Sequence, residues 1–247
     1  MKILVCISKT PDTTSKISFK DENTKFEDKG VQWIINPYDE WYALIKAIEL
    51  KEKDASVVLH LITVGQNDCD PIIRKALALG GEEAIRINAE SNDSYYVAAQ
   101  IAAVAEQGNY DIIFTGKETL DYNGNAVGGM IAEILDLPYI ALATKFELNG
   151  DKAIIQYEIE GGEEVCEVAL PVVVSCQEGM ATQRIPNMRG IMAARSKPLK
   201  VIDPVDATIS THVNRFEVAE TKTGVTLIPA DNVAALVQVL HEKIKVI

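Results

Sequence analysis

The stretch "DIIFTGKETLDYNGNAVGGMIAEIL", residues 111–135, joins an apolar run to an amphipathic run through a corner that contains four glycines, two asparagines and an aspartate. The continuous apolar run predicts a buried parallel strand, and the amphipathic run predicts a helix. In an open parallel sheet, ligands collect in the loops that follow the carboxyl ends of the strands. The corner is such a loop, and it is therefore a candidate ligand site.

Two interpretations fit the residues of this corner. Glycines allow a backbone to approach a ligand closely, and the N–H groups that begin a helix attract an anion such as phosphate. Asp121 could accept a hydrogen bond from a ribose hydroxyl, and Asn123 and Asn125 could reach a nucleotide. The same asparagines could instead cap the helix after a tight turn. The residues alone leave both interpretations open, because the corner matches neither a Walker loop nor GxGxxG.

Strands and helices alternate in the rest of the first half of the chain. Apolar, β-branched runs predict further buried strands at 2–7, 56–64, 84–87 and 171–176. Helical patterns occupy 35–53, 70–81 and 91–109. This alternation, which continues to about residue 138, predicts βαβ units and a parallel sheet, and thus an α/β fold class.

The first two helices carry terminal signals. Asn36 is placed to cap the first helix, with Pro37 at its first helical position. Asp70 and Pro71 repeat the arrangement in the second helix, and Gly80 is placed to end it in the left-handed conformation.

The pattern changes after residue 138. Alternating apolar and polar residues with "NGD" and "GG" turns predict an antiparallel meander over 139–170. Residues 177–200 read as an irregular loop with a short helix at 190–196, and 231–247 as a capped amphipathic helix. Residues 203–229 lack a strong period, which indicates an arm that lies on another protein and needs it for order.

Composition excludes several classes of protein. The chain has 247 residues, 47% of them hydrophobic, which suits one large domain with an appendage. Its formal net charge of -12 disfavours nucleic acid as a partner. The apolar run at the start is too short for a signal peptide, and no run approaches the roughly 18 apolar residues of a membrane span. A cytoplasmic location is expected.

Side chains that could perform catalysis or bind metal do not form a convincing set. The four cysteines, Cys6, Cys69, Cys166 and Cys176, show no CxxC spacing, which argues against zinc and against a disulfide framework. No nucleophile and no general acid and base pair stand out. We therefore expect no metal and no catalytic residue, and a chain that holds and presents a ligand.

Three further loops are expected at the same edge of the sheet as the corner. They are "CISKTPDTTSK" at 6–16, "INPYDE" at 35–40 and "VGQND" at 64–68. Four loops that converge on one edge favour a nucleotide site more than any single loop does.

A resemblance to a known family lies in these loops, in "DPIIRKALALGGEEAIRI" at 70–87 and in "QRIPNMRGIMAARSKPLKVI" at 183–202. Over most of its length, the chain resembles the β subunit of the electron transfer flavoprotein family. The resemblance implies an adenine-nucleotide hydrolase-like (Rossmann-like) α/β sandwich with an antiparallel extension and a C-terminal arm. Residues 1–200 would be the nucleotide-binding domain, and 201–247 the arm and helix that pack on an α subunit.

The resemblance also implies a function. The heterodimer would carry electrons from acyl-CoA dehydrogenases, in fatty acid β-oxidation, through FAD to a quinone oxidoreductase. FAD would be held mainly by the α subunit, with Thr13 near it, and AMP would be bound by this chain to support assembly. The residues implied to bind AMP are Cys6, Asn36, Pro37, Tyr38, Asp39, Val64, Lys117, Glu118, Asp121, Asn123, Gly124, Asn125, Ala126, Val127 and Gly128.

The segment "RIPNMRGIM" at 184–192 resembles the family's recognition loop, which docks on acyl-CoA dehydrogenases. Met188 would insert into a hydrophobic pocket of the dehydrogenase, with Arg184 and Ile191 beside it, and a flexible thioether suits an anchor for several partners. The alternative is that Met188 packs against its own domain.

Departures from the family pattern leave the nucleotide open. Relatives commonly have glutamine where this chain has Glu118 and Ala126. Some relatives place an aromatic residue close to the flavin of the partner, and this chain has Thr13 at that position. The sequence "PDTT" also occurs in relatives that bind a second FAD in place of AMP and bifurcate electrons. A third alternative is a stand-alone nucleotide-binding stress-type protein of the same fold.

Overall fold

A sheet of nine strands forms the centre of the computed structural model, which describes residues 1–220 and 224–246. The strand order is β11-β10-β9-β12-β8-β1-β6-β7-β13. From β12 to β13 all neighbours pair in parallel, whereas β10 pairs antiparallel with both β9 and β11. The predicted α/β class, with a parallel sheet and an antiparallel extension, is confirmed.

The bounds of the sheet strands follow the apolar runs of the sequence. They are β1 (Lys2–Cys6), β6 (Val58–Val64), β7 (Glu83–Ile87), β8 (Ile112–Gly116), β9 (Tyr139–Asn149), β10 (Lys152–Ile159), β11 (Gly162–Ala169), β12 (Val172–Cys176) and β13 (Leu199–Ile202). The central strands β1, β8 and β12 are almost wholly buried because helices cover both of their faces.

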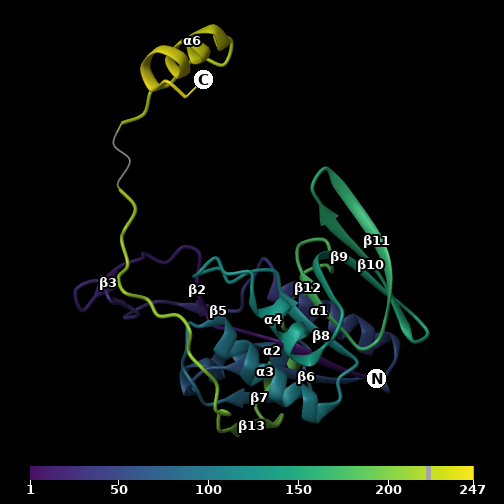
Figure 1. Cartoon of the computed structure of the whole chain (residues 1–247). Helices are drawn as coiled ribbons and strands as arrows, with labels where there is room; N and C mark the ends of the chain where they lie inside the picture. Colours follow the sequence, from purple (N-terminus) through teal and green to yellow (C-terminus); the bar gives the residue numbers. More distant parts are fainter. Residues whose placement is uncertain (221–223, 247) are drawn as a thin grey trace.

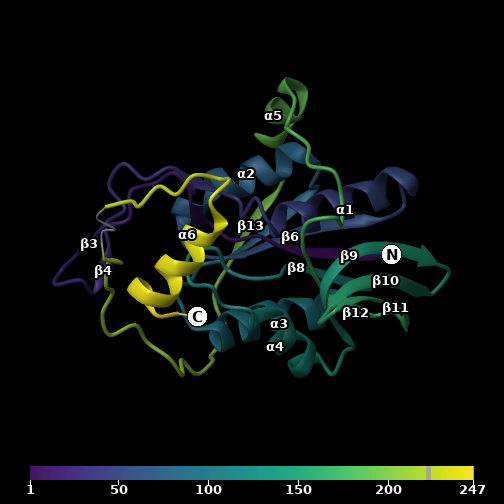
Figure 2. The same cartoon turned by 90° about the horizontal axis from the view of Figure 1, so that it is seen from above.

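The helices divide between the two faces of the sheet (Figure 2). One apolar core lies under α1 (Glu40–Lys53), α2 (Asp70–Leu79) and α5 (Met188–Ala194), and the other lies under α3 (Ser94–Gly108) and α4 (Val127–Leu135). A short 3-10 helix, η1 (Asn67–Cys69), precedes α2.

Helix α1 begins later than predicted. Its first residue is Glu40, and its N-cap residue is Asp39, three residues beyond the predicted cap Asn36. The Asn36 side-chain oxygen accepts from the N–H of Tyr38 at 3.0 Å, but this bond closes a turn that precedes the helix. The Asn36 amide donates to the carbonyl oxygen of Glu118 at 3.0 Å. The prediction that Asn36 caps this helix was therefore wrong.

Helix α2 and its end differ from the prediction in a similar way. Asp70 is the first helical residue, and its carboxylate forms an ion pair with Arg86 at 2.8 Å. Gly80 has φ 157° and ψ -10°, which is not the left-handed helical conformation that was predicted. A Cβ at Gly80 would lie 2.9 Å from Ile48, so close packing against α1 also favours glycine there.

Several short elements were not predicted. β13, in the region expected to be an irregular loop, adds an edge strand beside β7. Residues 7–35 form an excursion with two small antiparallel pairs, β2 (Thr10–Pro11) with β5 (Trp33–Ile34) and β3 (Phe19–Lys20) with β4 (Lys25–Phe26). The short helix expected near 190–196 is present as α5.

The described residues after β13, 203–220 and 224–246, form an extended segment and a terminal helix set away from the sheet (Figure 1). The terminal helix consists of α6 (Val233–Gln238) and a π-helical turn, η2 (Val239–Ile244), and Asn232 caps it by accepting from the N–H of Ala235 at 3.1 Å. The predicted arm includes residues 221–223, and the predicted last helix includes residue 247, which lie outside the described residues. No helix in the described part of the chain is long and apolar enough to cross a membrane.

Candidate functional site

The loop between β8 and α4, residues 117–126, occupies the carboxyl edge of the sheet. Thr119 folds it into a turn, since its backbone N–H donates to the carbonyl oxygen of Gly124 at 2.9 Å and its hydroxyl accepts from the N–H of Gly124 at 2.8 Å. Asn123 adopts φ 51°, the left-handed region that asparagine tolerates better than most residues. The turn keeps the loop compact at the end of β8.

The start of α4 is not capped by asparagine. Its N-cap residue is Ala126, whose methyl group cannot accept a hydrogen bond, so of the two interpretations of Asn123 and Asn125, capping of this helix is the one that the structure contradicts. A Cβ at Gly128 would lie 2.8 Å from the hydroxyl oxygen of Thr115, which lets α4 pack closely on β8. An uncapped helix start offers N–H groups to an anion.

Asn36 and Asp39 connect the segment before α1 to this loop. The Asn36 amide donates to the Glu118 carbonyl at 3.0 Å and to an Asp39 oxygen at 3.3 Å, and that same carboxylate oxygen accepts from the N–H of Glu118 at 3.3 Å. The Asn36 side-chain oxygen accepts from the N–H of Tyr38 at 3.0 Å. Two loops far apart in the sequence are thereby held together.

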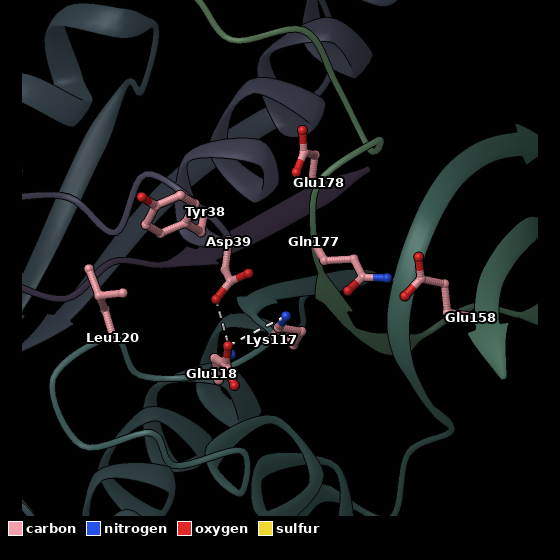
Figure 3. Close-up of a pocket in the computed structure, with 8 residues that line it drawn as sticks. All are labelled: Tyr38, Asp39, Lys117, Glu118, Leu120, Glu158, Gln177 and Glu178. Carbon is pink, nitrogen blue, oxygen red and sulfur yellow. Dashed lines mark hydrogen bonds and ion pairs between the residues drawn. The ribbon is translucent and has the colours of Figure 1, made fainter. Parts of the chain in front are cut away.

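These loops border an open pocket of about 420 Å³ (Figure 3). Its lining residues are Tyr38, Asp39, Lys117, Glu118, Leu120, Glu158, Gln177 and Glu178. Four of the eight are carboxylates, and Lys117 lies 3.4 Å from the carboxylate of Glu118. The pocket is suited to a ligand that presents hydrogen-bond donors to it.

Leu120, Glu158, Gln177 and Glu178 were not among the predicted site residues. Gln177 and Glu178 directly follow β12, so the same strand-end reasoning that selected the other loops could have found them. Glu158 reaches the pocket from β10 of the antiparallel extension. Its position depends on tertiary pairing, for which the sequence carries no local signal.

Glu40, the first residue of α1, is a further buried group that sequence reasoning missed. Its carboxylate accepts from the N–H of Ser8 at 2.8 Å and from the Ser8 hydroxyl at 2.6 Å, which fixes the loop after β1. Burial raises the pKa of Glu40 to about 7, with smaller contributions from the nearby Asp121 and Asp39. The Ser8 hydrogen bonds oppose this shift.

Burial also changes the other titratable groups of the site. It raises the pKa of Asp39 and of Asp121, against the attraction of Lys117 and Lys9 respectively. It likewise raises the pKa of the Cys6 thiol, with Glu40 adding to the effect. Poorly hydrated carboxylates of this kind are strong acceptors for hydroxyl groups.

The predicted nucleotide-site residues fall into two groups. The β8–α4 loop residues and 36–39 are brought together by the hydrogen bonds described above. Cys6 lies buried at the end of β1, and Val64 ends the neighbouring strand β6, where the Thr63 hydroxyl donates to the Ile7 carbonyl at 2.8 Å. Thr13, which was predicted to lie near the FAD of the α subunit, is exposed in the excursion at 7–35.

The predicted docking residues lie on or beside α5. Met188 is 72% exposed and does not pack into its own domain, which contradicts the alternative interpretation of this residue. Ile185, Ile191 and Met192 are also exposed. Arg184 is held by Glu52 at 2.7 Å and 2.9 Å, so it fixes the loop to α1. We call Ile185, Met188, Ile191 and Met192 the α5 face.

Glu40 makes the stability of the chain depend on pH. Its folded-state pKa of about 7 lies above the ordinary value of 4.5, so the folded state keeps a proton that the unfolded state loses. The free energy of unfolding should therefore fall as pH rises from 4.5 to 7, and Glu40→Gln should remove about 3 kcal/mol of that fall. Urea unfolding at pH 4.5 and pH 8 measures the difference.

Glu106→Gln, at an exposed position of α3, is the matched control and should behave as the unchanged chain does. Equal pH dependence in Glu40→Gln and the unchanged chain would show that the Glu40 carboxylate is not desolvated as described.

The sheet and its strand-end loops define an α/β protein of the Rossmann-like class, with its candidate site at the carboxyl edge. The model of the electron transfer flavoprotein domain matches residues 23–207. The chain belongs to the electron transfer flavoprotein family, among proteins named as its β subunits.

Relatives with this name come from distant organisms. The chain is 34% identical to "Electron transfer flavoprotein subunit beta" of Bacillus subtilis (strain 168) over an alignment 261 positions long that covers all of both chains. It is 36% identical to the protein of the same name from Syntrophomonas wolfei, with 91% of this chain and 88% of the relative covered. The human protein of that name is 32% identical, with 83% and 82% covered.

Proposed function

We propose that this chain is the β subunit of a heterodimeric electron transfer flavoprotein and acts as an electron carrier. The observation that carries the proposal is similarity to a β subunit along the full length of both chains. Electrons would pass from acyl-CoA dehydrogenases, through the FAD of the heterodimer, to a quinone oxidoreductase. The four cysteines are free thiols, which supports a reducing cytoplasm as the compartment.

AMP is the nucleotide that we assign to the carboxyl edge. The residues present fit it, because the start of α4 and Lys117 suit phosphate, while Asp39 and Asp121 suit ribose hydroxyls. Glycine at position 124 keeps the loop compact, since a Cβ there would lie 3.3 Å from the Thr119 hydroxyl. The bound AMP would support folding and assembly by binding the native state, with no chemical change of its own.

FAD is assigned mainly to the α subunit. It would supply the redox chemistry of the complex, and this chain would contribute surface beside it from the excursion at 7–35, which contains the exposed Thr13. The isolated chain should therefore be colourless, and a yellow complex should form only with the α subunit. FAD bound tightly by the isolated chain would contradict this assignment.

The α5 face is assigned to docking on acyl-CoA dehydrogenases, with Met188 as its main apolar contact. Met188→Ala should weaken docking about tenfold, because it removes an apolar anchor from the centre of a small interface. The nucleotide content should stay unchanged, since Met188 lies on α5 and outside the strand-end loops. Titration of a dehydrogenase with the purified heterodimer measures the docking affinity.

Val165→Ala is the control for this variant, because Val165 is similarly exposed but lies on the edge strand β11. It should leave docking unchanged. Equal affinities for Met188→Ala and Val165→Ala would remove Met188 from the interface.

A further inference from the structure

The first part of the C-terminal arm is bonded to helix α3 of its own chain. The buried side chain of Gln100 donates to the carbonyl oxygen of Val205 at 2.9 Å and accepts from the N–H of Val205 at 2.8 Å. This pair of bonds satisfies both backbone groups of one arm residue. It fixes the chain three residues after β13 ends.

Asp93 forms a second attachment five residues further along. One carboxylate oxygen caps α3 by accepting from the N–H of Tyr96 at 2.7 Å. The other accepts from the N–H of Ser210 at 3.1 Å, the N–H of Thr211 at 2.7 Å and the Thr211 hydroxyl at 2.7 Å. Bonds to an ionised acceptor are stronger than neutral ones, so one buried carboxylate binds two separate segments.

A third contact involves the excursion at 7–35. The Phe216 ring stacks on Phe19 with centroids 4.7 Å apart and planes 6° from parallel, and the Phe216 N–H donates to the carbonyl oxygen of Asn23 at 2.7 Å. Figure 1 shows the arm rising from β13 past β3 before it reaches α6. Residues 205–216 of the arm therefore contact other parts of the same chain.

Apolar side chains are exposed in the first part of the arm as well, at Val205, Ile209 and Val213, but the most exposed ones of the arm lie in residues 224–246. Val225 and Leu227 are 84% and 89% exposed, and the terminal helix exposes further apolar side chains at Val233, Leu236, Val237 and Ile244. Apolar exposure of this extent in one segment is typical of a surface that a partner covers.

We propose that Asp93 and Gln100 are positioning residues that fix the proximal arm, residues 203–216, on α3 before the partner binds. The α subunit would then meet the distal segment, residues 224–246, at a preset place. This inference rests on the proposed function for the identity of the partner. Fixing the proximal arm in advance reduces the conformational entropy that association must overcome.

Hydrogen exchange of the isolated chain tests the attachment without the α subunit. The amides of Val205, Ser210, Thr211 and Phe216 should exchange slowly, and those of the distal segment outside the terminal helix should exchange fast. Asp93→Asn keeps an oxygen that can cap α3 but replaces the other acceptor with an amide. Exchange at Ser210 and Thr211 should then become at least about tenfold faster, because each hydrogen bond to a charged group contributes appreciably.

The control is Asp54→Asn, in which an exposed turn carboxylate that accepts from the N–H of Ser56 at 2.9 Å is changed in the same way. It should leave exchange in the arm unaltered. Unprotected amides at Ser210 and Thr211 in the unchanged chain, or equal exchange in Asp93→Asn, would overturn the inference.

Binding to the α subunit gives the second readout. Asp93→Asn should bind about tenfold more weakly than Asp54→Asn, because the free arm samples many conformations. Equal affinity despite a released arm would overturn the positioning role. Failure of the unchanged chain to bind the α subunit would instead refute the proposed function, so the two failures are distinguishable.

Discussion

Gly116→Val should release the nucleotide from the purified heterodimer and lower the free energy of unfolding by about 3 kcal/mol. Gly116 ends β8 at the point where the chain passes the start of α1. A Cβ there would lie 2.9 Å from the Glu40 Cγ atom, 3.1 Å from the Asp39 Cβ atom and 3.3 Å from the Glu40 backbone nitrogen. Valine would therefore push apart two segments that the candidate site needs together.

The nucleotide should be affected more than the fold. Moving the loop that begins at Lys117 breaks its bonds to Asn36 and Asp39, so we expect nucleotide affinity to fall at least about a hundredfold. Equilibrium dialysis with AMP measures the affinity, and urea unfolding measures the stability.

Gly129→Ala is the matched control from the same stretch of sequence. A Cβ at Gly129 would meet Tyr139 at 3.5 Å, an ordinary contact, and alanine favours helix over glycine by about 1 kcal/mol. This variant should keep its nucleotide and be no less stable. Retained nucleotide in Gly116→Val would show that the loop position does not control binding.

Gly190→Val should abolish docking on acyl-CoA dehydrogenases while the nucleotide content stays unchanged. A Cβ at Gly190 would lie 2.3 Å from the carbonyl oxygen of Ala78, a backbone atom near the end of α2 that cannot move freely. Valine must therefore displace α5 from α2, and the α5 face moves with it. We expect docking to weaken by about a hundredfold or more, since several contacts lose their alignment together.

Hydrogen bonds between the α2 region and the end of α5 explain why the effect should be large. Arg74 donates to the carbonyl oxygens of Ala194 at 2.8 Å and Lys197 at 2.6 Å, and the Lys197 ammonium donates to Leu77 at 2.8 Å and Gly81 at 2.6 Å. These bonds tie both ends of the segment after α5 to α2 and require the close approach that glycine permits.

Gly162→Ala serves as the control, because a Cβ at Gly162 meets no atom of the described residues within 4 Å. It should dock as the unchanged protein does. Normal docking by Gly190→Val would mean that α5 is not the surface that the dehydrogenase contacts.

The parallel sheet could be predicted because its strands are continuously apolar and β-branched, a pattern that burial on both faces requires. The start of α1 could not, because the Asn36 side-chain oxygen closes a turn before the helix and Asp39 is the residue that precedes Glu40. The Asn36 amide also donates to Glu118, a residue 82 positions away, and a local cap signal does not reveal that contact. β13 was missed for a related reason, because "LKVI" becomes a strand through its pairing with β7.

The candidate site shows the same division. Loops at strand ends were selected correctly as neighbours, because parallel topology brings them to one edge. Glu40 was missed, since an acid in the first turn of a helix usually faces water. Its burial against Ser8 depends on how the loop after β1 folds back, and no sequence pattern records that contact.

As a β subunit, this chain is proposed to hold AMP at its carboxyl-edge site, in a complex with an α subunit that holds FAD. The most direct test is to denature the purified heterodimer, identify the released nucleotides by chromatography and mass spectrometry, and count them per heterodimer. One AMP and one FAD are predicted. Two FAD and no AMP would refute the assignment of AMP and place the corner at residues 116–129 in a redox site of a bifurcating flavoprotein.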